Sequence, residues 1–247
     1  SNGSEVASID QAGTITATNF TGTGGNLTVK SDGTTPAIIL RDSDNNIDGM
    51  FKALNGTVGM QVAGGDWALL ATTNAEISLY HDNAVKLATS ATGVAVTGGV
   101  AIGGTGAANT LDDYEEGTFT AAFTSTGASF SYTARNGFYT KIGNRVIYNI
   151  YMQLDGSQTL TANQVTITNL PFTSTSTSWH QSSSIAETRY VDFDSGFTYL
   201  SGRIGVGTSI ITLLEGGDGQ ATSSLRSDQL NSSSGQVFLS GSYQTDS

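Results

Sequence analysis

The sequence of 247 residues contains no cysteine, two prolines and only 13% charged residues. Without cysteine the chain forms no disulfide, no thiolate metal site and no cysteine nucleophile. No apolar run approaches the roughly 20 residues that a membrane-spanning helix requires. We therefore expect a protein that does not insert into a membrane.

Basic residues are scarce as well. The chain has ten lysines and arginines and 21 aspartates and glutamates, which gives a formal net charge of −11. The basic residues are never clustered. A protein that binds nucleic acid or an anionic membrane through charge carries a basic patch. The charge distribution therefore excludes nucleic acid and an anionic membrane surface as partners.

Small polar residues are abundant instead. Serine, threonine and glycine together supply more than a third of the chain, and 37% of the residues are hydrophobic. Threonine favours strands, whereas glycine and serine favour turns. Because the hydrophobic residues alternate with polar ones, the composition predicts an all-β fold and not disorder.

Residues 76–104 consist of short apolar pairs that are separated by polar turns. Their spacing of two is typical of strands that show one side to a core. Strands as short as these offer one chain little core, so we expect a core that is shared with other copies of the chain. The residues that we predict to be buried between chains are Leu79, Leu87, Val94 and Val96.

The composition changes near residue 110. Before it, Asn55-Gly56 separates two alternating runs, which predicts a hairpin with a type I′ turn.

After residue 110 the predicted strands are longer, and this part contains most of the aromatic residues. The run 145–154 predicts a central strand of the sheet. We therefore predict a β-strand shaft over residues 1–110 and a β-sandwich, jelly-roll-like head over residues 111–247.

Residues 77–98 read ISLYHDNAVKLATSATGVAVTG, and the segment 36–48 contains LRDSDN. The first segment resembles a recurring unit of bacteriophage tail fibres, and the second is similar to another phrase that is common in such fibres. Residues 110–119, 136–146 and 169–172 resemble the start of a C-terminal domain on tail fibres, especially those of marine phages. The resemblance covers roughly residues 36–172.

The resemblance implies an elongated homotrimer that forms part of a virion. Its upstream partners would be other phage tail or fibre proteins, and its head would bind a bacterial surface glycan or an outer-membrane receptor during host adsorption. No cofactor is expected. We also consider two alternatives, a tailspike-type depolymerase that cleaves the same polysaccharide with carboxylates, and a purely structural fibre segment.

Candidate chemistry is sparse. Asp44, Asn46 and Asp48 match the first half of a calcium-binding loop, but Asn55 stands where the bidentate glutamate belongs, so a polar turn is the stronger interpretation. Nothing in the sequence marks a catalytic nucleophile, and adjacent carboxylates such as Asp112 and Asp113 do not face each other across a sugar. We therefore predict that the protein is not an enzyme.

Recognition is the remaining function, and two polar segments are candidates for it. In the first, residues 173–184 place one tryptophan and one histidine among serines and threonines, a surface that can stack on a sugar ring and bind its hydroxyls. The alternative is that the tryptophan covers the sandwich as a lid. The second segment is 223–235. The predicted ligand-binding residues are Trp179, His180, Tyr190, Asp192, Asp194 and Arg226.

Overall fold

The computed structural model describes residues 8–9, 15–16, 35–41, 46–177, 179–231 and 234–246. These residues form antiparallel β-sheets, and their only helices are the 3₁₀ helices η1 (Ala107–Asn109) and η2 (Ser227–Gln229). The prediction of an all-β fold is confirmed. No helix in this part of the chain has the length and apolar character needed to span a membrane.

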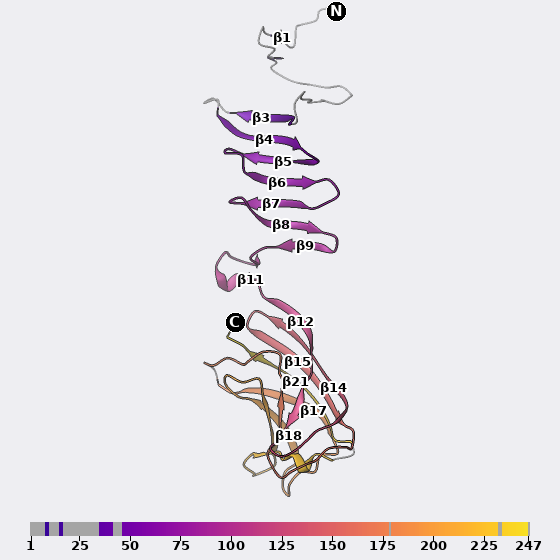
Figure 1. The fold of residues 1–247 in the computed structure, drawn as a ribbon. Helices are drawn as coiled ribbons and strands as arrows, with labels where there is room; N and C mark the ends of the chain where they lie inside the picture. The colour runs from indigo at the N-terminus through magenta and orange to yellow at the C-terminus, as the bar shows by residue number, and fades with distance from the viewer. Residues whose placement is uncertain are drawn as a thin grey trace, which may run out of the picture. The chain divides into compact units, whose positions relative to one another are not determined.

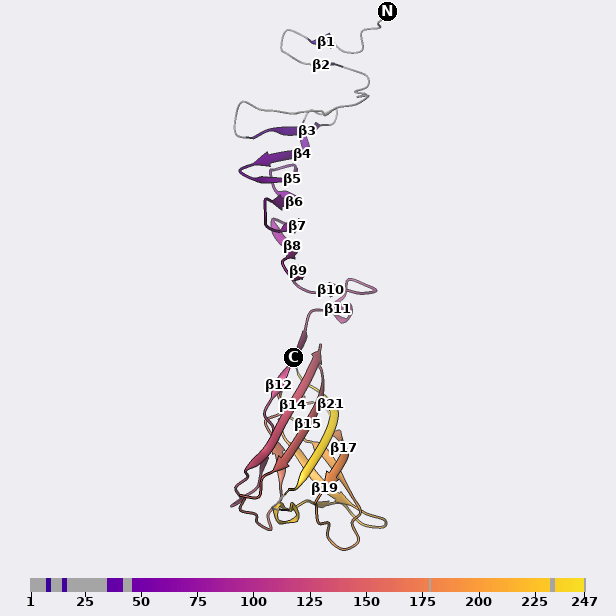
Figure 2. The same ribbon diagram turned by 90° about the vertical axis from the view of Figure 1, so that its right-hand side faces the viewer.

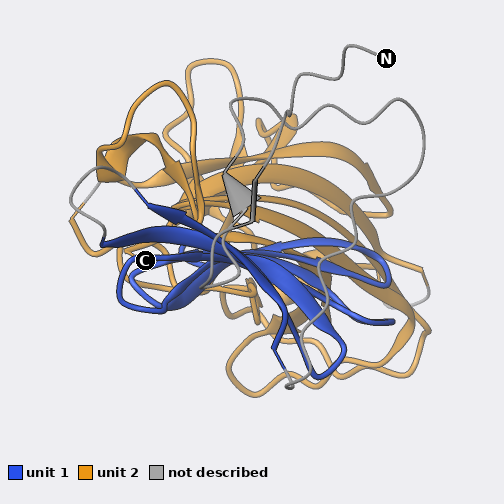
Figure 3. Cartoon of the chain, turned by 90° about the horizontal axis from the view of Figure 1, so that it is seen from above, with its two compact units in different colours: residues 1–98 blue, residues 99–247 orange. Residues whose placement is uncertain are grey.

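The chain divides into two compact units, residues 1–98 and 99–247 (Figure 3). The predicted boundary at residue 110 lies inside the second of these units, because strand β10 (Val100–Ala101) pairs with strand β11 (Thr110–Leu111). The aromatic-rich part of the sequence begins only after this small hairpin. The boundary predicted from composition therefore lies at the end of the hairpin, whereas the second unit begins before it.

Unit 1 is dominated by a seven-stranded sheet in which each strand pairs with the next along the chain (Figure 1). The backbone also forms a short pair, β1 (Ser8–Ile9) with β2 (Ile15–Thr16). Asn55 and Gly56 have φ values of 49° and 80° between the second and third strands of the large sheet, so the predicted hairpin is confirmed. The seven strands are β3 (Ala37–Arg41), β4 (Ile47–Leu54), β5 (Thr57–Val62), β6 (Trp67–Thr72), β7 (Ile77–His81), β8 (Ala84–Ser90) and β9 (Gly93–Val96).

One face of this sheet is apolar from the first strand to the last. Paired residues of neighbouring strands point to the same side, so the register defines rows of side chains across the sheet. We call the following residues the apolar face: Ile38, Phe51, Met60, Leu69, Leu79, Leu87 and Val96 in one row across all seven strands, and Ala53, Val58, Ala71 and Ile77 beside it.

The apolar face is open to solvent in the single chain. Leu79 is 41% exposed and Val96 is 43% exposed, while Leu87 is half-buried. Val94, beside this row, is 60% exposed. Among the described residues, every fully buried apolar side chain lies in unit 2. The sheet of unit 1 therefore has no core of its own in these residues, and burial between chains stays a prediction.

The opposite face of the same sheet is mixed and partly self-covered. The Trp67 ring lies over Gly59, where an added Cβ would stand 2.8 Å from the ring atom Cζ3. Lys52 Nζ donates to Gln61 Oε1 at 3.3 Å, and Gln61 is buried. On this face the Trp67 ring covers backbone, and polar side chains form hydrogen bonds with each other. The apolar face is therefore the surface that needs a partner.

Unit 2 contains one ten-stranded antiparallel sheet, which curls so that its inner face encloses the core (Figure 2). The strands that we predicted as a sandwich of two sheets are therefore hydrogen-bonded along one continuous path. Its strands, in sheet order, are β12 (Tyr114–Phe119), β14 (Tyr132–Ile142), β15 (Arg145–Leu154), β21 (Gln236–Gln244), β17 (Gln181–Arg189), β18 (Tyr199–Ile204), β19 (Ile211–Gly216), β16 (Thr166–Thr168) and β13 (Ala122–Thr124), with β20 (Ser223–Ser224) paired to β19.

Strand β15 shows why this sheet has two distinct faces. It lies inside the sheet between β14 and β21, as the sequence predicted for a central strand. Its alternate residues are buried on the inner face, and the residues between them point outward. Tyr151 and Ile147 are on the outer face, as expected. The buried residues of β15 are Val146, Tyr148, Ile150, Met152 and Leu154.

Candidate functional site

The structure brings together the segments that follow β17 and β20, which contain four of the six predicted ligand-binding residues. Asp192 N donates to Gln229 O at 2.8 Å, and Asn231 N donates to Tyr190 O at 2.9 Å. Tyr190 has a φ of 57° and is exposed. Asp192 and Asp194 lie in irregular backbone and not on a strand face. Backbone pairing across 190–194 and 229–231 therefore makes one surface from two segments that are distant in sequence.

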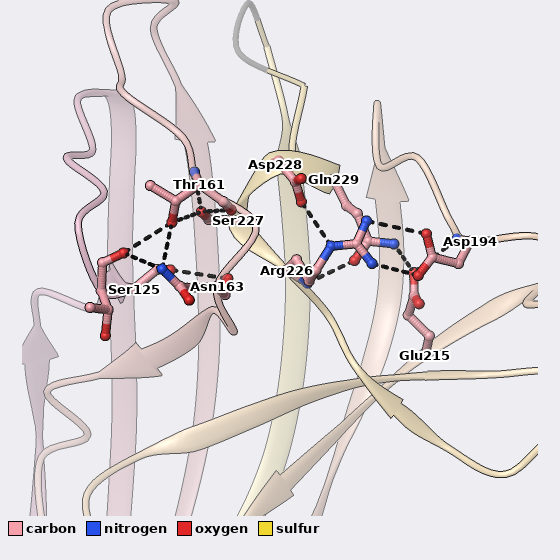
Figure 4. Close-up of polar contacts among 10 residues, drawn as sticks. Ser125, Thr161, Asn163, Asp194, Glu215, Arg226, Ser227, Asp228 and Gln229 are labelled. Atoms are coloured by element: carbon pink, nitrogen blue, oxygen red, sulfur yellow. Dashed lines mark hydrogen bonds and ion pairs between the residues drawn. The ribbon is translucent and has the colours of Figure 1, made fainter.

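Arg226 is the centre of a cluster on this surface (Figure 4). Its Nη1 and Nη2 donate to Asp194 Oδ2 at 2.5 Å and to Asp194 Oδ1 at 3.2 Å, and its Nε donates to Asp228 Oδ1 at 3.1 Å. The guanidinium of Arg226 holds the pKa of the Asp194 carboxyl below its usual range, chiefly through these hydrogen bonds. Two carboxylates thus take up three of the nitrogen atoms of this arginine.

A buried carboxyl group supports the same cluster from below. Glu215 is fully buried at the end of β19; its Oε1 accepts hydrogen bonds from Gln229 Nε2 and, at 3.3 Å, from Asp194 N. Gln229 Oε1 in turn accepts from Arg226 N at 2.7 Å. Glu215 Oε2 is buried without a hydrogen-bond partner in the structure. Glu215 therefore positions the loop residues and has no surface on which a ligand could contact it.

The other side of η2 is attached to the segment before β16. Ser227 is fully buried; its Oγ donates to Thr161 O at 2.7 Å and accepts from Thr161 N at 2.9 Å (Figure 4). Ser125 Oγ donates to Asn163 O at 3.1 Å next to this contact. η2 is thus fastened on both sides, which makes the Arg226 cluster a structural joint between loops.

Trp179 and His180 lie apart from this cluster. They directly precede β17, whose first residues pair near the C-terminal end of β21, whereas Arg189 at the other end of β17 pairs with Gln236 at its start. Trp179 is 93% exposed, so it does not cover the sheet as a lid. The six predicted ligand-binding residues therefore form two groups at opposite ends of β17.

His180 lines a hollow of about 720 Å³ on the outer face of the sheet, over β15, β21 and β17. The hollow has a largely hydroxyl and amide lining, because serines and an asparagine occupy the outward positions of these strands. Arg145 also lines it and donates from Nη2 to Ser242 Oγ at 2.6 Å. The lining residues include Ser182, Ser184, Ser240, Ser242 and Asn149.

A second hollow of about 230 Å³ continues from the first, since Asn149 and Ser240 line both. Its wall is aromatic: the rings of Tyr151 and Phe238 stack with centroids 4.3 Å apart and planes at 28°. Phe138 also lines it and is exposed. We call the two hollows together the outer groove; strands β14, β15, β21 and β17 carry it side by side (Figure 2).

Sequence reasoning missed most of the outer groove. Its residues lie on or next to four strands. β14 and β15 are consecutive in the sequence, but only the pairing of β21 between β15 and β17 brings the other two strands beside them. The outward position of Tyr151 was predictable from the alternation of β15, but its stacking on Phe238 was not. Of the predicted site residues, only His180 belongs to this groove.

The predicted calcium-like loop has no complete site in the described residues. Asp44 lies outside these residues, and Asp48 belongs to β4 and is exposed, with Asn46 immediately before that strand. No group of three or more histidine, aspartate or glutamate side chains in the described ranges could hold a metal ion.

Comparison with known proteins adds no relative: no family model, no curated protein and no solved structure matches this chain.

Proposed function

We propose that this chain is the distal part of a bacteriophage tail fibre, an elongated homotrimer that recognises a bacterial surface receptor during host adsorption. Unit 1 forms the shaft and unit 2 forms the receptor-binding head. The receptor is a surface polysaccharide. The sequence resemblance over residues 36–172 supports the family, and the structure of unit 1 supports the assembly.

The apolar face of unit 1 is the observation that carries the proposal. A single β-sheet with one continuous apolar face is not stable as an isolated layer in water, because burial of that surface supplies the main driving force for folding. Exposed apolar surfaces that continue across a whole sheet mark interfaces with other protein chains. Three copies around a threefold axis would cover each other's apolar faces and enclose the row that contains Leu79 and Val96.

The head supplies a surface suited to weak, repeated binding of sugars. Its curled sheet encloses a core as the layers of a jelly-roll-like sandwich do, and the outer groove combines aromatic rings with hydroxyl and amide groups. Three linked heads raise the effective affinity by about 10²- to 10⁴-fold when all can engage together. Weak single sites are therefore sufficient for adsorption.

The depolymerase alternative requires two carboxylates that flank a glycosidic bond, about 5–9.5 Å apart. In the Arg226 cluster, Glu215 is fully buried, and Asp194 and Asp228 are both bound to Arg226. This cluster therefore offers a glycan no such pair, which favours recognition over cleavage.

Light scattering of the purified full chain tests the assembly, and a glycan array of bacterial surface polysaccharides tests the recognition. We expect a mass three times the 25.5 kDa of one chain and binding to a subset of the polysaccharides. A monomer in solution would contradict the proposal that unit 1 forms a trimeric shaft. Release of new reducing ends from a bound polysaccharide would replace recognition by cleavage, and a trimer that binds no glycan would support a purely structural segment.

A further inference from the structure

The outer groove contains basic side chains and no acidic ones. The chain has 21 acidic and 10 basic residues, yet no aspartate or glutamate is among the residues that line either hollow. The groove contains Arg145 near one end, and His180 lies in the same hollow. In a protein with a net charge of −11, this distribution selects for a ligand that carries negative charge.

The described ion pairs leave Arg145 without a carboxylate partner, as they also leave Arg203, but only Arg145 lines the groove. Arg226 and Arg189 are bound to carboxylates of their own chain, whereas Arg145 contacts the Ser242 hydroxyl and takes part in none of the ion pairs between described residues. A guanidinium has five N–H donors in a planar fork that matches a carboxylate. Most of the donors of Arg145 are thus available to a ligand in the groove.

The aromatic half of the groove is suited to the apolar face of a sugar ring. Phe238 is 36% exposed in its stack with Tyr151 and lines a hollow whose volume, about 230 Å³, suits a single ring. Glu187, the cross-strand neighbour of Phe238, is paired with Arg189 at 2.5 Å. The charge of this neighbouring acidic residue is therefore compensated within the protein.

We propose that the outer groove binds an oligosaccharide that carries a carboxylate, with Arg145 paired to the carboxylate and the Tyr151–Phe238 wall against a neighbouring sugar ring. Asn149 and Ser240, which line both hollows, provide hydrogen bonds to the hydroxyls between these two contacts. This inference rests on the proposed glycan-binding function and adds the chemical class of the ligand and its location.

Binding of the full chain to pairs of oligosaccharides tests the proposal. Each pair consists of an oligomer of a uronic or sialic acid (galacturonate, alginate, hyaluronan and polysialic acid) and the same oligomer with its carboxyls reduced to alcohols. We expect binding of at least one acidic member by calorimetry, with about tenfold or greater weakening on reduction, because a charge-assisted hydrogen-bonded pair is lost. Equal binding of both members in every pair would overturn the proposal.

Variants locate the contact. Arg145→Gln is expected to remove the preference for the acidic member, and Phe238→Ala is expected to weaken both members alike. Ser242→Asp would give Arg145 a carboxylate in its own chain and should abolish the preference while the arginine is still present. Lys86→Gln, on an exposed position of β8 in unit 1, removes a positive charge outside the groove and is the control that leaves binding unchanged. A preference that survives both Arg145→Gln and Ser242→Asp would contradict the proposal.

The outcomes separate this proposal from the function on which it rests. Binding of neutral glycans alone, or acidic binding that does not depend on Arg145, overturns the proposed ligand and leaves receptor recognition intact. No binding to any glycan overturns both. If Phe238→Asp changes the mass measured by light scattering, a second copy of the chain covers the groove, and the proposed ligand site is wrong.

Discussion

Arg226 binds both carboxylate oxygens of Asp194, 32 residues away in the sequence. This contact joins the loop after β17 to the start of η2. Two parallel N–H···O bonds fix the orientation of both side chains as well as their distance. The same arginine also holds Asp228. The geometry shows that Arg226 links the two loops, and the prediction that it binds a ligand stays a prediction.

The Arg226–Asp194 contact makes part of the stability of unit 2 dependent on pH. Arg226 lowers the pKa of Asp194, so the contribution is fully present above the ordinary aspartate pKa of about 3.9 and is lost as the pH falls through the lower pKa of the folded protein. We expect Arg226→Gln to unfold at a lower temperature than the wild type at pH 7, and the difference to shrink below pH 3. Thermal unfolding followed by circular dichroism measures both values.

Arg203→Gln is the matched control for this comparison, because Arg203 is exposed and takes part in none of the described ion pairs. An unfolding temperature of Arg226→Gln that differs from the wild type by the same amount at pH 7 and below pH 3 would show that the carboxylate is not involved.

Val96 and Ala95 are neighbours in β9 and point to opposite faces of the unit 1 sheet. A charge on the apolar face would be buried at the proposed interface, which is strongly unfavourable without a partner charge. We therefore expect Val96→Glu to weaken or abolish the proposed trimer and Ala95→Glu to leave it intact. Light scattering over a range of concentrations distinguishes the two, and equal behaviour of both variants would argue against the apolar face as the interface.

Glu215 is expected to be important for the stability of unit 2. Glu215→Ala leaves the Gln229 amide and the Asp194 N–H without their acceptor, and it opens a void beside them. The unfolding free energy should fall by on the order of 2–4 kcal/mol. Glu215→Gln keeps one oxygen acceptor, so the unfolding free energy should fall by less than in Glu215→Ala. Denaturant unfolding measures these changes; Glu116→Ala, at an exposed position of β12, serves as the control and should change stability by less than about 0.5 kcal/mol.

The two tryptophans report on different surroundings. Trp179 is 93% exposed, whereas Trp67 is half-buried over Gly59. In a Trp67→Phe variant the remaining fluorescence should be close to that of free tryptophan in water and readily quenched by iodide. In a Trp179→Phe variant the emission should lie at shorter wavelength. Protected emission from Trp179 in the first variant would restore the lid interpretation.

The sequence by itself determined the fold class and the local elements of this protein. Alternation with a period of two places Val146 and Tyr148 inside and Tyr151 outside, and positive φ at Asn55 and Gly56 makes a hairpin, because these are properties of neighbouring residues along one strand or turn.

Only the tertiary structure decided which strands share a sheet. The C-terminal strand β21 pairs between β15 and β17, and this long-range choice brings Tyr151 to Phe238 and Arg145 to Ser242. Such pairings depend on how the whole core closes, since many strands of similar pattern could pair locally equally well. The apolar pairs of unit 1 were visible in the sequence, but their alignment into one row across seven strands follows from the register of the sheet.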